Sequence, residues 1–196
     1  MSAAGATLAL VADHLVGFTV NEALAKLLKA RMDKARALLT EELKRGLHPD
    51  LSQDELAAAL FKYLRAAQEG MSARNLRMLA QSLGTLASEQ ALIAETFRRD
   101  TESLASLSVE EIILLRAFLA ALKAGLTEPN EIWNDAANSL KGTASFPDLE
   151  ALVVVASALT RTGFVVPWPT LSGMIFIPTT TLQRVARRVD FTKDDD

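Results

Sequence analysis

Apolar residues recur at helical spacing along most of this chain. In residues 20–45 they follow one another at steps of three or four, which places them on one stripe of a helix: Leu24, Leu28, Met32, Ala35, Leu39 and Leu43. Gly46 and Pro49 come next, and both are typical of a helix end. The pattern therefore predicts one amphipathic helix over residues 20–45.

Two capping boxes predict the starts of further helices. Ser52 is followed three residues later by Glu55, and Ser108 by Glu111. Between them, apolar residues keep a three-four alternation that continues through Gln90 and Ile93 to Phe97, and its leading members are Leu76, Leu79, Leu83 and Leu86. This heptad seam predicts one helix over residues 76–97. The seam suits an antiparallel bundle or an interface between two copies of the chain.

The polar segment 98–108 predicts a boundary between two parts of the chain. We expect an N-terminal helical region over residues 1–100 and a second module over residues 108–190. The second module should contain helices near 109–125, 127–140 and 148–163, because Gly and Pro punctuate the apolar runs there. A last helix should begin with Thr180 as its N-cap and Gln183 as the partner in a capping box, and residues 191–196 should form an acidic tail.

The segment "GFVVPWPTLSGMIFIP" at 163–178 departs from the helical pattern. Two short apolar runs flank a proline-rich turn, which predicts a small hairpin with strands near 163–167 and 173–178. Pro167 and Pro169 should hold Trp168 at the tip of that turn. Because exposed aromatic residues often anchor interfaces, Trp168 and Phe176 are candidate protein-interaction residues. The alternative is that Trp168 folds back over the core of its own module.

Three helices, a hairpin and a closing helix, in that order, resemble a winged helix-turn-helix over roughly residues 108–190. The run of helix, Gly163, strand, turn, strand, Thr179 and helix is also similar to the C-terminal part of bacterial abortive-infection proteins of the Abi-alpha type. Those proteins usually place a glycine shortly after the threonine, whereas this chain has Thr179-Thr-Thr-Leu182. The resemblance implies a mainly α fold, with a module used for DNA binding or for protein docking.

Composition narrows the choice between these uses. Hydrophobic residues make up 49% of the 196 residues, and a mean hydropathy of +0.17 suggests that some apolar surface is buried in a partner or a second copy. The sequence has no cysteine, so thiol nucleophiles, disulfides and zinc–thiolate sites are excluded. A cysteine-free chain suits a cytoplasmic bacterial protein.

Charge argues against nucleic acid as the partner of the second module. Residues 107–178 carry four Lys or Arg against seven Asp or Glu, a balance of -3, and the hairpin has no cation. Phosphate neutralisation supplies most non-specific DNA affinity, so an acidic module should repel DNA. The exception is a cluster on the last helix, made of Arg184, Arg187 and Arg188. These three are candidate anion contacts, and a DNA-binding regulator that uses them is the first alternative function.

A second alternative is a membrane-surface or phage-defence factor. The apolar stretch 7–20 is interrupted by Asp13 and His14 and is too short to span a bilayer, but the basic helix that follows could lie on an anionic surface. We find no glycine-rich phosphate loop, nucleophile elbow or clustered metal ligands. We therefore expect a non-enzymatic interaction protein without cofactor or metal. It should bind a protein partner or form a homodimer through the 76–97 seam or the N-terminal apolar helix.

Overall fold

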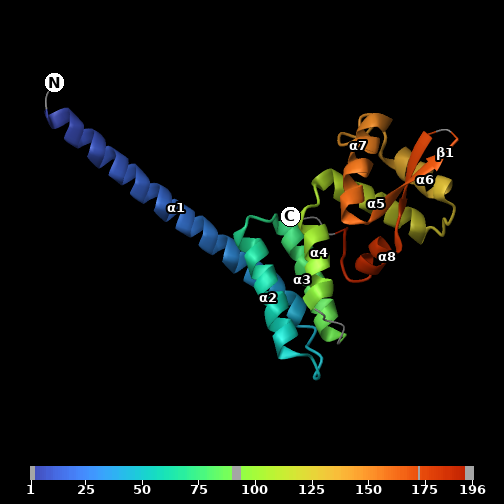
Figure 1. Ribbon diagram of the computed structural model, residues 1–196, viewed down its shortest axis with the longest axis horizontal. Helices are drawn as coiled ribbons and strands as arrows, with labels where there is room; N and C mark the ends of the chain where they lie inside the picture. The colour runs from blue at the N-terminus through green and yellow to red at the C-terminus, as the bar shows by residue number, and fades with distance from the viewer. Residues whose placement is uncertain (1–2, 90–93, 172, 193–196) are drawn as a thin grey trace.

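The computed structural model describes residues 3–89, 94–171 and 173–192, with side chains from residue 21 onward. Over these residues the chain is mainly helical with one small antiparallel hairpin, which confirms the predicted mainly α character and the hairpin (Figure 1). The helices are α1 (Ala3–Leu43), α2 (Gln53–Gln68), α3 (Ala73–Ser88), α4 (Ala94–Ala105), α5 (Val109–Lys123), α6 (Pro129–Leu140), α7 (Leu149–Leu159), the short 3-10 turn η1 (Thr160–Thr162) and α8 (Thr180–Ala186).

Helix α1 is much longer than the predicted helix over 20–45. Its C-terminal part packs on α2 and α3, whereas its N-terminal part projects away from the rest of the chain (Figure 1). At a rise of about 1.5 Å per residue, the part before Arg31 extends roughly 40 Å. No helix in the described part of the chain combines the length and the hydropathy needed to cross a bilayer.

The four leucines of the predicted seam lie in the core of the chain itself. Leu76, Leu79, Leu83 and Leu86 are at most 2% exposed and pack within the bundle formed by α1 to α4. Their burial is therefore complete within one chain. The expectation that they form an interface between two copies is wrong.

The same seam does not continue as one helix. Helix α3 ends at Ser88 and α4 begins at Ala94, so the predicted helix over 76–97 is two helices, and Gln90 and Ile93 lie outside the described residues. Helix α4 runs on to Ala105, so most of the segment 98–108 is helical rather than a linker. The amide of Asn75 on α3 donates to the carbonyl oxygens of Ala105 and Leu107 at 3.0 and 3.1 Å, which ties the end of α4 to the bundle.

The C-terminal part builds its core from α5, α6, α7 and the hairpin. Strands β1 (Val165–Thr170) and β2 (Gly173–Pro178) pair antiparallel, with Trp168 opposite Ile175. Phe176 is 3% exposed, and its ring lies 5.4 Å from that of Trp133 on α6, which in turn lies 6.2 Å from Phe118 on α5. This aromatic row fixes the hairpin to the helices.

Three local predictions need correction here. Trp168 lies inside β1 and not at the turn, because β1 extends to Thr170. The side chain that caps α8 belongs to Thr179, which accepts from the amide of Leu182, and not to Thr180. Phe191 is 3% exposed, so the start of the predicted acidic tail is packed against the core, and residues 193–196 lie outside the described residues.

An ion pair connects the start of α5 to the turn η1 that follows α7. Both guanidinium nitrogens of Arg161 donate to the buried carboxylate of Glu111, one of them at 2.8 Å, and Arg161 also donates to the carbonyl oxygen of Ser106 at 2.6 Å. Glu111 in turn accepts from the backbone of Ser108, which completes the predicted capping box. Burial raises the pKa of Glu111, but the hydrogen bonds from Arg161 and Ser108 and the charge of Arg161 outweigh burial and leave that pKa below its usual value.

Arg161→Ala should lower the free energy of unfolding at pH 7 by about 2 kcal/mol, because the Glu111 carboxylate would stay buried without its partner. This loss of unfolding free energy is smaller than the full cost of breaking a buried ion pair, because the Arg161 side chain is 43% exposed. A lowered carboxyl pKa stabilises the fold above the unfolded-state pKa, so this stability should fade from about pH 4.5 downward.

Urea denaturation of the wild type and the variant at pH 7 and pH 3.5 measures both effects. The gap between the two proteins should narrow in acid. Arg36→Ala is the matched control, since the exposed pair of Arg36 with Asp33 spans 3.9 Å and should contribute little. A gap that widens in acid would contradict this role of Glu111.

Candidate functional site

The hairpin presents large apolar side chains to solvent. Trp168 and Met174 are each 50% exposed, Leu171 at the turn is fully exposed, and Leu149 at the start of α7 is 46% exposed. We call these four residues the hairpin patch. Exposed apolar side chains that gather on one part of a soluble protein are typical of an interaction surface.

A groove of about 600 Å³ runs beside the hairpin patch. Three patch residues, Leu149, Leu171 and Met174, line it together with Trp133 and Ile175. Trp168 is the strand partner of Ile175 but is not itself among the residues that line the groove. The floor is therefore supplied by core residues and the walls by exposed ones, which suits an inserted apolar side chain.

Polar residues line this groove, and acidic residues are next to lining residues in the sequence. The side chains of Asn130 and Asn134 on α6 line it, and among the described residues of its lining none is charged. Just outside the lining, exposed carboxylates follow or flank groove residues in the sequence: Glu131, Asp135, Asp148 and Glu150. We call these four the acidic rim. The site can therefore offer apolar burial and hydrogen bonds in its centre, with negative charge around it.

The structure separates the two hairpin residues chosen from the sequence. Trp168 is half-exposed at the surface, whereas Phe176 is buried against Trp133 and supports the hairpin from below. Sequence reasoning missed Leu171, Met174 and Leu149. The signal that could have indicated the first two is their place around the turn, where apolar residues are out of place unless they have a partner.

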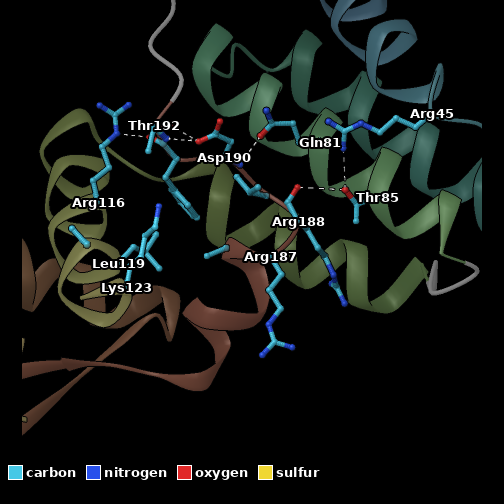
Figure 2. A pocket seen from close by; sticks show the side chains of 14 residues that line it. Arg45, Gln81, Thr85, Arg116, Leu119, Lys123, Arg187, Arg188, Asp190 and Thr192 are labelled. Carbon is cyan, nitrogen blue, oxygen red and sulfur yellow. Dashed lines mark hydrogen bonds between the residues drawn. The ribbon is translucent and has the colours of Figure 1, made fainter. Parts of the chain in front are cut away.

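A second hollow of about 630 Å³ lies between the bundle and the C-terminal helices, and its lining includes five cations: Arg45, Arg116, Lys123, Arg187 and Arg188. Figure 2 shows that these side chains do not converge. Arg45 and Arg116 lie on opposite sides of the hollow, and Arg187 points away from both. A single anion could not reach all of them at once.

Several of these cations have partners within the chain. Arg45 pairs with Glu42 at 3.0 Å, the Nε of Arg116 donates to the carbonyl oxygen of Phe191, and Arg188 pairs with Asp100 at 3.4 Å. On the same side, the backbone amide of Asp190 donates to Gln81 at 2.9 Å (Figure 2). Around the hollow, the C-terminal segment is therefore tied to α3, α4 and α5.

The carboxylate of Asp100 interacts with two of the three arginines predicted to contact anions, Arg188 and Arg184. Its side chain is 3% exposed and accepts from Ser82 at 3.1 Å and from Arg188. Burial raises the pKa of Asp100, against the hydrogen bond from Ser82 and the positive charges of Arg188 and Arg184. Arg188 and Arg184 thus act on a carboxylate of their own chain. Arg187 is exposed and lines the hollow and a smaller neighbouring depression.

No protein-family model, curated protein or solved structure matches this chain. Within the described residues, no group of three or more His, Cys, Asp or Glu side chains gathers as a metal ion would require. Of the two surfaces, the groove and its hairpin patch form the candidate functional site, because the four apolar side chains of the patch stay at least 46% exposed among the described residues.

Proposed function

We propose that this protein is a non-enzymatic interaction protein that docks another polypeptide onto the hairpin patch. The observation that carries the proposal is the full exposure of Leu171 and the half exposure of Met174, which line the same groove as Trp133, together with the half-exposed Trp168 on the same hairpin. Burying such side chains is worth about 1.5–3 kcal/mol each, which makes them suitable anchors.

The same proposal treats the C-terminal part as a winged-helix-like unit used for protein docking. The order α5, α6, α7, hairpin and α8 supports this reading. Helix α7 stands in the place of a recognition helix, and the guanidinium of Arg161, in the turn η1 that follows it, is already held by Glu111. Readout of bases and phosphates needs free cationic or amide side chains, so the occupied Arg161 favours a protein over DNA.

Docking at the hairpin should use side chains rather than an added strand. Pro167 and Pro169 lie in β1 and have no amide hydrogen, so β1 cannot offer a full row of donors to another strand. The hairpin therefore avoids uncontrolled strand pairing while its turn stays apolar. Specific contact then depends on the shape of the groove.

A photo-crosslinking amino acid at position 171 tests the proposal in the cells that make the protein. We expect position 171 to crosslink to a polypeptide, because the patch should be covered in its working state. Position 61 is the matched control: Phe61 on α2 is 66% exposed but lies outside the patch. Equal capture at the two positions, or none at 171, would count against docking through the patch.

A further inference from the structure

We propose that the polypeptide docked in the groove is the exposed segment of α1 at residues 21–30, contributed by a second copy of this chain. The inference rests on the proposed function, since it names the partner of the same patch. It starts from two apolar surfaces that one chain leaves uncovered, the hairpin patch and the projecting helix.

The described side chains of the projecting helix carry a bare apolar stripe. Every side chain from 21 to 30 is exposed, and Leu24, Leu27 and Leu28 are 55%, 69% and 44% exposed. We call residues 21–30 the arm. Ala35 and Leu39, further along α1, are buried against the bundle, so the arm continues a stripe whose other half is covered. Anchors at spacing i, i+3 and i+4 are those of a helix that lies in a groove.

The charges of the arm and of the groove are opposite. Lys26 and Lys29 are exposed on the arm, and Lys34 is exposed just beyond it. Within the arm, Glu22 pairs with Lys26 at 3.0 Å, so the surplus positive charge comes from Lys29 and Lys34. The four exposed carboxylates of the acidic rim each belong to a residue that is next in sequence to a residue lining the groove. An apolar stripe flanked by lysines thus matches an apolar groove flanked by carboxylates.

The arm cannot reach the groove of its own chain. Helix α1 is continuous from Ala3 to Leu43, and its C-terminal part is fixed to the bundle by Tyr63, whose hydroxyl donates to the carbonyl oxygen of Ala35 at 2.9 Å. The arm points away from the hairpin (Figure 1). The arm of a second copy meets no such restriction. Two copies that exchange arms would form a closed pair with two identical contacts, which helps to reach the roughly 800 Å² per partner of a stable interface.

Introduced cysteines test the pairing, because the natural chain has none. Full-length Leu28→Cys and differently tagged Leu171→Cys chains are mixed and treated with a short bismaleimide. We expect a crosslinked product that contains both tags. The matched control mixes Leu28→Cys with Phe61→Cys, an exposed position outside the patch. Equal yields from the two mixtures, or no mixed product from Leu28→Cys and Leu171→Cys, would overturn the inference.

A charge exchange tests the same contact without crosslinking. Lys29→Glu with Lys34→Glu should weaken self-association roughly tenfold, because each rim contact is expected to be modest. Adding the partner chain with Glu131→Lys and Asp135→Lys should restore binding between the two variants, as measured by sedimentation. Failure of restoration in the mixture would contradict the arm–rim pairing.

These outcomes separate the two proposals. If position 171 crosslinks in cells to a different polypeptide and the mixed cysteine chains do not react, the hairpin patch is a docking surface and the second copy is not its occupant. If position 171 captures no polypeptide, both proposals fail together.

Discussion

Trp133→Ala is expected to lower the free energy of unfolding by about 3–5 kcal/mol, the usual cost of removing a large buried aromatic side chain. Trp133 is 5% exposed and joins α6 to α5 through Phe118 and to β2 through Phe176. The variant should also weaken docking, because the floor of the groove would be lost. Urea denaturation followed by circular dichroism measures the first effect.

Trp168→Ala is the control for that experiment. Trp168 is 50% exposed, so its removal should change the free energy of unfolding by less than about 1 kcal/mol while it reduces docking. The two variants would then separate the effect on the free energy of unfolding from the effect on docking. A large loss of stability in Trp168→Ala would show that the side chain covers its own core, which is the alternative raised by the sequence.

Gly84→Leu is expected to destabilise the bundle by at least about 3 kcal/mol, because extra bulk in a close-packed core forces the backbone apart. A Cβ atom at Gly84 on α3 would lie 3.0 Å from both the Cβ and the carbonyl oxygen of Glu42 on α1. The carbonyl belongs to the backbone of α1 and cannot rotate away. The leucine should therefore push α1 off α3 and loosen the base of the arm.

Gly84→Ala provides a graded control. Its single methyl group meets the same contact, but alanine favours a helix over glycine by about 1 kcal/mol, so the net loss should be small. Hydrogen exchange of residues 31–43, compared across the wild type and both variants, reports whether α1 has detached. Protection in Gly84→Leu equal to that of the wild type would contradict a close approach of the two helices.

Features set by neighbouring residues could be predicted from the sequence. The capping box of Ser108 and Glu111 forms as expected because both partners lie within one helical turn. The box at Ser52 is half formed. Ser52 accepts from the amide of Glu55, but the Glu55 carboxylate accepts from the backbone of Ala94, 39 residues away. Contacts between residues this far apart in the sequence cannot be predicted from a local pattern.

Burial was harder to predict than helix formation. Leu24, Leu28 and Leu39 belong to one stripe, yet only Leu39 is covered, because the pattern does not show where the bundle ends. The heptad spacing of Leu76 to Leu86 suits both an internal seam and an interface between copies. The packing of α1 against α3 makes it an internal seam.

The candidate site shows the same limit. Trp168 and Phe176 have similar sequence surroundings, apolar strand residues near a turn, but α6 covers only Phe176. The three arginines of the last helix look like an anion site until the buried Asp100 is placed beside two of them. In both cases the deciding residue is distant in the sequence, so composition and spacing could not supply it.

Sedimentation velocity of the full chain over a range of concentrations tests most directly whether the hairpin patch pairs with the arm of a second copy. We expect the wild type and Phe61→Ser to shift from the mass of one chain to that of two, and Leu171→Ser to stay at one. The account would be contradicted by Leu171→Ser chains that associate as strongly as the wild type, or by a wild type that sediments as one chain throughout.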